Sequence, residues 1–99
     1  MARPAAANVI AAGARAPTPD EAAASIVAAP DLRSEIRNWF GHLTGEKRLA
    51  ALSLIAYHRD VANFFEFLSD HLGGPADIAS VRDLHLRDFR SYLAKRRRE

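Results

Sequence analysis

Four histidines are the side chains best suited to bind a metal ion, but their spacing does not fit that role. His42, His58, His71 and His85 lie 16, 13 and 14 residues apart. Helices that bind zinc through histidine present two of them three or four residues apart, so that both reach one ion. No two histidines have that spacing here, and the sequence has no cysteine. We therefore expect no metal site and no cofactor.

A possible nucleophile and base are close together at Ser53, Tyr57 and His58. Adjacent residues on a helix point in different directions, and no third side chain is spaced to orient the histidine. The double glycine before Pro75 follows a predicted helix, so it ends a helix instead of opening one around a phosphate. These patterns favour a binding protein over an enzyme.

The stretch from Leu49 to Leu72 is the longest apolar segment, and the other elements must pack against it. Its apolar residues recur at steps of three and four, which is one face of an α-helix. They are Leu54, Tyr57, Val61, Phe64, Phe65, Leu68 and Leu72. The opposite face carries Ala56, Arg59, Asn63, Glu66 and Asp70. A helix with such a polar back can pack on one side and bind a partner on the other.

Two further helices are expected beside this one. Asp31 can cap a helix over residues 32–44, which Gly45 ends. Its apolar face holds Leu32, Ile36, Trp39, Phe40 and Leu43, and the two aromatic residues are expected against Tyr57, Phe64 and Phe65. A last helix over 86–98 would pack through Leu86, Phe89, Tyr92 and Leu93. It starts at His85, where the Asp88 carboxylate can bond free amides.

The predicted fold class is all-α: a small SAM-like bundle of three main helices, about 32–44, 51–72 and 86–98. Residues 77–84 are predicted to form a loop with a short helical turn, and no segment shows the alternating pattern of a strand.

Residues 1–30 hold thirteen alanines and four prolines, so we expect a mostly disordered tail before an incomplete helical domain over 31–99. Within the tail, Thr18 could cap a short helix over 19–28. Such a helix is marginal alone and would be ordered only if it docked.

The charge is unevenly distributed along the chain. Residues 1–30 are balanced, residues 31–81 sum to −2 and residues 82–99 sum to +4. This distribution favours an anionic partner such as nucleic acid near the carboxyl end, although a solvated helix end would look the same.

No apolar run approaches the roughly 20 residues of a membrane-spanning helix. We expect a cytoplasmic protein with neither a membrane nor a small molecule as partner.

Three segments together resemble the amino-terminal core-binding domain of Xer-type tyrosine recombinases. Residues 48–61, followed by Phe64 and Phe67-Leu68, are similar to the family pattern R-L-S-x-x-T-L-x-A-Y-R-R-D-L-x-x-F-x-x-F-L. Trp39-Phe40-x-x-Leu43 and residues 84–94 resemble the helices before and after it. The likeness covers about residues 32–98. The sequence departs from the pattern at Ala50, Ser53, His58 and His85.

The resemblance implies a domain that binds a recombination half-site in duplex DNA. In this family a separate carboxyl-terminal domain, with its arginines, lysine, H-x-x-R segment and nucleophilic tyrosine, cuts and rejoins the strands, and none of it is in these 99 residues. The chain also stops before the family's next helix. No catalytic residue is therefore expected here, while the parent protein would be a recombinase acting in DNA integration or recombination. Chromosome dimer resolution, and with it cell division and chromosome partition, is one role the family implies, with homologous recombinase subunits as partners.

Six residues are candidate DNA contacts, three of them implied by the resemblance and three by their place on the helix. Lys47, Arg48 and Ser53 would contact phosphates at the start of the central helix, where helix amides favour anions. Arg59 and Asn63 could read guanine and adenine edges, and His58 could add a phosphate contact if protonated. Ordinary solvent exposure is the alternative for each of them. For the whole chain, the alternative is a helical protein-interaction module that does not bind DNA.

Overall fold

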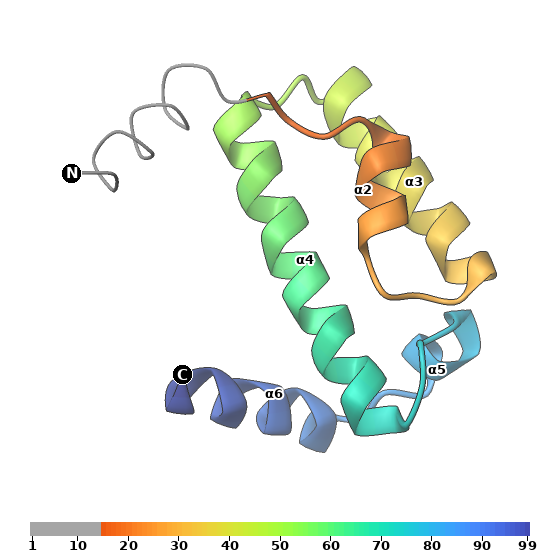
Figure 1. The fold of residues 1–99 in the computed structure, drawn as a ribbon, viewed down its shortest axis with the longest axis vertical. Coiled ribbons are helices and arrows are strands. Elements are labelled where there is room, and N and C mark those ends of the chain that lie inside the picture. The colour runs from red at the N-terminus through yellow and green to blue at the C-terminus, as the bar shows by residue number, and fades with distance from the viewer. Residues whose placement is uncertain (1–14) are drawn as a thin grey trace.

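A computed structural model describes residues 15–99, which fold into helices joined by short connections (Figure 1). The described helices are α2 Pro19–Ser25, α3 Pro30–Gly45, α4 Ala51–Leu72, α5 Ile78–Arg82 and α6 Leu86–Arg98. Between residues 15 and 99 the only β pairing is one isolated bridge joining Ala28 to Ala76. The predicted all-α class is confirmed. The three main helices lie at the predicted places, and α5 is the short helical turn expected between 77 and 84.

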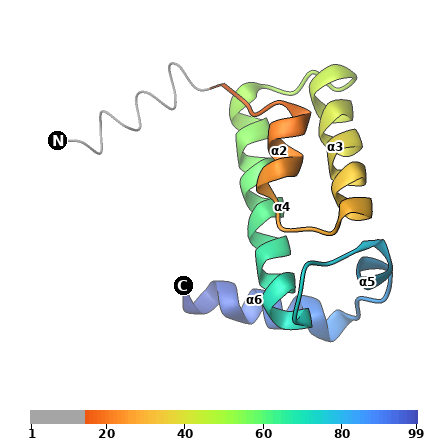
Figure 2. The same cartoon turned by 45° about the vertical axis from the view of Figure 1, so that its right-hand side comes forward.

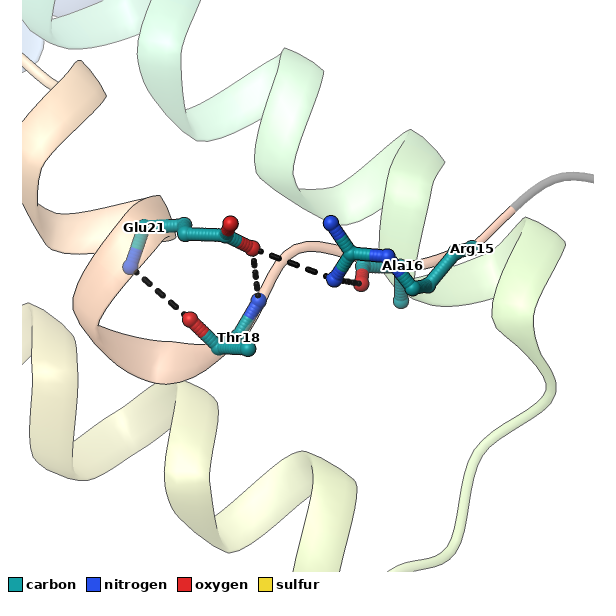
Figure 3. Close-up of polar contacts among 4 residues, drawn as sticks. All are labelled: Arg15, Ala16, Thr18 and Glu21. Atoms are coloured by element: carbon teal, nitrogen blue, oxygen red, sulfur yellow. Dashed lines mark hydrogen bonds and ion pairs between the residues drawn. The ribbon is translucent and has the colours of Figure 1, made fainter.

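Helix α2 begins with the cap that the sequence predicted. The Thr18 hydroxyl accepts a hydrogen bond from the Glu21 amide at 3.1 Å, and the Thr18 amide donates to Glu21 Oε1 at 2.8 Å (Figure 3). Arg15 Nη1 donates to the same carboxylate oxygen at 3.2 Å. The Thr18 amide, followed by Arg15, therefore lowers the pKa of Glu21.

The helix that Thr18 caps lies over the seam between α3 and α4 (Figure 2). Ala22, Ala23 and Ile26 are buried there, and Asp20 forms an ion pair with Arg37 on α3 at 2.8 Å. This short helix was expected to be ordered only if it docked, and in the structure it does dock on α3 and α4. This corrects the expectation of a tail for residues 15–30, because small alanines let α2 approach the seam closely. The remainder of the predicted tail lies outside the described residues.

Helix α3 begins two residues earlier than predicted, and Asp31 is not its cap. Ala29 occupies the cap position with no side-chain hydrogen bond, and Pro30 is the first helical residue. The Asp31 carboxylate instead accepts from the amide of Leu32 at 2.6 Å and from that of Ile78 at 3.4 Å. Asp31 therefore links the start of α3 to the start of α5, a contact between residues far apart in the sequence.

The buried side of α4 is narrower at its amino end and wider at its carboxyl end than the periodicity predicted. Leu54, Phe65 and Leu68 are buried as expected, and Phe67 is buried as well. Tyr57 is 45% exposed and lines an open apolar hollow with Trp39, Leu43 and Leu49. The aromatic contacts of α3 also differ from expectation. Phe40 is fully buried with Ala22 and Leu54 rather than against Phe64 and Phe65, and Trp39 is partly exposed.

Two clusters of buried residues hold the helices together, one toward each end of α4. The amino-end cluster consists of Ala22, Phe40 and Leu54. The carboxyl-end cluster is larger and consists of Ala23, Ile26, Ala28, Leu32, Ile36, Phe65, Phe67, Leu68 and Ala76. Most of the core therefore surrounds the carboxyl-terminal half of α4.

Helix α6 crosses the carboxyl-terminal end of α4 at a steep angle (Figure 1). Its Tyr92 packs against Phe64 and Phe67, with ring centroids 5.1 and 5.2 Å apart, and Phe89 stacks on Phe64 at 5.7 Å. A crossing helix buries only a few of its side chains. Leu86, Phe89 and Leu93, predicted as core, are therefore largely exposed, Leu86 at 65%.

The carboxylate of Asp88 fixes the start of α6. Asp88 accepts from the His85 amide at 2.7 Å, as the sequence suggested, and its other oxygen lies 2.8 Å from His71 Nε2 at the end of α4. These hydrogen bonds, that of His85 first, lower the pKa of Asp88.

Candidate nucleic-acid interface

The start of α4 is an uncapped helix end without negative charge. Ala50 sits at the cap position with no side-chain hydrogen bond, and the first turn has no acidic residue. The first helical bond runs from the Leu54 amide to the Ala50 carbonyl at 3.1 Å. The amides of Ala51, Leu52 and Ser53 thus have no acceptor within the helix. Such amides, with the helix dipole behind them, favour an anion.

Two cationic residues, Lys47 and Arg48, lie in the turn that precedes these amides. Lys47 and Arg48 are both exposed, and within residues 15–99 neither side chain forms an ion pair. The nearest acid in the turn, Glu46, lies 3.0 Å from His42 Nδ1 instead. The positive charge at the start of α4 is therefore not neutralised by its own turn.

The turn that carries these cations is held by its backbone. The Lys47 amide donates to the His42 carbonyl at 3.1 Å, and the Leu49 amide donates to the Leu43 carbonyl at 3.3 Å. Arg48 adopts a left-handed conformation with φ +50°, which is uncommon for a residue with a β-carbon. Lys47 and Arg48 are thus presented from a defined turn.

Arg59 and Asn63 share the exposed polar back of α4, as predicted. Arg59 makes only a loose contact with Asp60, at 3.8 Å between Nε and Oδ1. Asn63 lines a small polar hollow between α4 and α6, together with Glu66, Asp70 and Lys95. The polar back is therefore cationic toward its amino end and acidic beyond Asn63.

Lys95 belongs to this acidic region. Its Nζ lies 2.6 Å from Glu99 Oε2, and that contact, helped by Glu66 and Asp70, raises the pKa of Lys95. The Lys95 ammonium is therefore already paired with Glu99.

His58 is separated from the other predicted contacts. Adjacent helix residues lie about 100° apart, so His58 faces away from Arg59 and the polar back. Its Nε2 lies 2.8 Å from Ser25 Oγ on α2, and its ring packs edge-on against Phe40 at 6.1 Å. The Ser25 hydroxyl also donates to the Ala22 carbonyl at 3.1 Å. Because the hydroxyl has only one proton, the His58 contact is then made with Nε2 as the donor and the serine oxygen as the acceptor. His58 therefore contacts both α2, through Ser25, and α3, through Phe40.

The structure thus places Lys47 and Arg48 in the turn before α4 and Ser53 in its first turn, sets Arg59 and Asn63 on one face, and pairs His58 with Ser25 on α2. The contact that sequence reasoning missed is Ser25, which gives no periodic signal because it lies at the end of a short alanine-rich helix. The pairing of His42 with Glu46 was visible as a four-residue spacing.

The described residues contain neither a cluster of metal ligands nor a membrane-spanning helix. No three histidine or acidic side chains in residues 15–99 gather as metal ligands would. None of the helices formed by these residues is long and apolar enough to cross a membrane.

Comparison with known proteins identifies the family. The family described as "Phage integrase, N-terminal SAM-like domain" matches residues 36–99, so the chain belongs to this family. The match confirms the core-binding, SAM-like domain of Xer-type recombinases that the sequence resembled.

The curated relatives are recombinases. Tyrosine recombinase XerC of Agrobacterium fabrum is 44% identical over 72 residues, 73% of this chain and 23% of that protein. The XerC of Brucella suis is 39% identical over 74 residues, 75% of this chain and 24% of that protein. The XerC of Rhizobium meliloti is 38% identical over 69 residues, 70% of this chain and 22% of that protein. The chain spans about a quarter of the length of these relatives, and no solved structure matches it.

Proposed function

We propose that this chain is the half-site-binding domain of a tyrosine site-specific recombinase and that it binds duplex DNA through the start of α4. The observation that carries the proposal is the uncapped, acid-free amino end of α4 beside Lys47 and Arg48. Membership of a recombinase domain family supports DNA as the anion in question. Three free amides and two cations suit the phosphates of a DNA backbone.

The same proposal gives the remaining residues their roles. Ser53 would donate to a phosphate from the first turn, while Arg59 and Asn63 would face the groove and contact base edges. The parent protein would cut and rejoin DNA with homologous subunits in the cytoplasm, and chromosome dimer resolution is the role we favour. Cleavage itself would belong to a part of the parent outside this chain.

A salt titration tests the proposal. We expect the chain to bind a random-sequence 30-base-pair duplex at 50 mM salt, followed by fluorescence anisotropy. Each phosphate contact contributes about −0.9 to the slope of log K against log salt, so Lys47→Gln with Arg48→Gln should make the slope less negative by about 1.8. The matched control, Arg37→Gln with Arg82→Gln, removes the same charge from α3 and α5 and should leave the slope unchanged. Absence of binding at 50 mM salt, or equal slopes for both pairs, would contradict the proposal.

One observation favours the protein-interaction alternative. An apolar groove runs between α3 and α4, with Trp39 shared by two adjoining hollows of about 390 and 280 Å³. If this groove were the working surface, a helical peptide would perturb the amides of Trp39 and Tyr57. The chain would then bind no duplex at 50 mM salt, which separates this alternative from the first proposal.

A further inference from the structure

We propose that the outward face of α6 is a second phosphate-binding surface, formed by Arg87, Arg90, Arg97 and Arg98. The proposal rests on the proposed function, because it assigns duplex DNA as the polyanion. It concerns residues that lie outside the site at the start of α4.

The four arginines share one side of α6. At about 100° per residue they fall within an arc of roughly 100°, centred opposite the side on which Tyr92 packs against α4. All four side chains are exposed. Only Ser91 and Ala94 lie between them on this face. Every charged residue on the outward face of α6 is therefore a cation.

The acids of α6 are engaged elsewhere. Asp88 is bonded to the His85 amide and to His71, on the side that faces α4. Glu99 is bonded to Lys95 at 2.6 Å. The remaining cation of the helix, Arg96, lies over the Tyr92 ring at 6.0 Å. Within residues 15–99 the four outward arginines form no ion pair, so their charge is available to a partner.

The dimensions suit a phosphate backbone. From Arg87 to Arg98 the helix rises about 16 Å at 1.5 Å per residue. Phosphates on one DNA strand advance about 3.4 Å per base pair along the axis, so the face matches roughly five base pairs. A guanidinium can bond a phosphate through two parallel N–H groups, which suits arginine better than lysine to this contact.

A lipid surface fits this face less well than DNA. An interfacial helix buries its apolar side and places cations along the flanks of that side. Here the arginines form the centre of the outward face, while Leu86 and Leu93 lie at one edge, and aromatic packing holds α6 on α4. A surface that approaches α6 face-on meets guanidinium groups first.

This surface is distinct from the start of α4. The two lie near opposite ends of α4, whose 22 residues span about 33 Å (Figure 1). The acidic stretch with Glu66 and Asp70 lies on the back of α4 between them. DNA can therefore be contacted at two separate places, and each can be removed without the other.

The test compares matched variants of the same chain. Arg87→Gln, Arg90→Gln, Arg97→Gln and Arg98→Gln together should make the slope of log K against log salt less negative by about 3.6 for the 30-base-pair duplex. For a matched single replacement, Lys95→Gln on the same helix is the control and should leave the slope unchanged, whereas Arg90→Gln alone should make it less negative by about 0.9. Circular dichroism should show the same helix content in all variants.

The outcomes separate this inference from the proposed function. If the quadruple variant has the wild-type slope while the Lys47 and Arg48 variant does not, the inference is overturned and the proposed function stands. If the slope becomes less negative only in the quadruple variant, the inference stands and the site at the start of α4 is wrong. Binding of wild type to phosphatidylserine vesicles but not to the duplex would overturn both.

Discussion

The two ends of α4 have opposite characters. Its amino end follows a cationic turn, has no capping side chain and leaves Leu52 half exposed. Toward its carboxyl end α4 buries Phe65, Phe67 and Leu68 and is crossed by α6, although its last residue, Leu72, is 44% exposed before the helix ends at Gly73.

The contrast shows how a small helical domain divides one element between folding and binding. Free amides and unneutralised cations at the amino end would cost stability if they were buried, so they remain at the surface. The larger apolar cluster at the carboxyl end compensates by holding α3, α5 and α6 around the helix. Substitutions at the carboxyl end should therefore change stability, and substitutions at the amino end should change binding.

The largest effect on stability is expected for Leu68→Ala. Leu68 is fully buried in the carboxyl-end cluster, and such a truncation costs about 2–5 kcal/mol, depending on how far the site collapses. Leu52→Ala, at the exposed amino end, should change the free energy of unfolding by only about 0.5 kcal/mol or less. Urea unfolding followed by circular dichroism measures both. Equal losses would remove the contrast between the two ends.

A smaller loss is expected for Gly73→Ala. Gly73 ends α4 with φ +86°, a conformation that costs a residue with a β-carbon about 1–2 kcal/mol. Gly74→Ala is the matched control, because Gly74 has no positive φ and a β-carbon there would meet no atom within 4 Å. If the two variants unfolded at the same temperature, the left-handed end of α4 would not be the reason for the glycine.

Acid should weaken the attachment of α6 through Asp88. Because the pKa of Asp88 is lowered on folding, its stabilisation is present above the usual carboxyl value of 3.8 and is lost as pH falls through the folded value. Asp88→Asn should lower the melting temperature at pH 7 and flatten its dependence on pH between about 5 and 2. His71→Gln removes one partner of the same carboxylate and should produce part of that flattening. An unchanged pH profile in Asp88→Asn would show that this carboxylate does not hold α6.

The smallest effect is expected for Ser25→Ala. Losing the exposed hydrogen bond to His58 should cost about 0.5 kcal/mol. Hydrogen exchange should then become faster in α2 but not in the carboxyl-terminal half of α4. Ser34→Ala, whose hydroxyl bonds only the Pro30 carbonyl in its own helix, is the control. Faster exchange throughout the chain would mean that α2 is not a separately attached element.

Local patterns were sufficient to predict the helices. Apolar residues at steps of three and four located α4, Gly73 ended it at the predicted residue, and the capping residues at Thr18 were read correctly. What could not be predicted depends on how helices cross. The exposure of Leu86 follows from the steep angle of α6 on α4, and no residue spacing encodes that angle.

The candidate site was predictable to a similar extent. Lys47 and Arg48 could be placed beside a helix start from the sequence, and Ala50 already indicated a missing cap. The hydrogen bond between His58 and Ser25 could not be predicted from the sequence, since Ser25 lies 33 residues away on a helix whose docking depends on tertiary contacts. The outward arginines of α6 become a single surface only once the inward side of that helix is known.

The most direct test of the central claim is a nuclear magnetic resonance titration of the ¹⁵N-labelled chain with the 30-base-pair duplex at 50 mM salt. We predict that the amides of Ala51, Leu52 and Ser53, which have no helical acceptor, shift progressively with added duplex together with those of Lys47 and Arg48. Duplex binding that leaves all five of these amides unmoved would contradict the account.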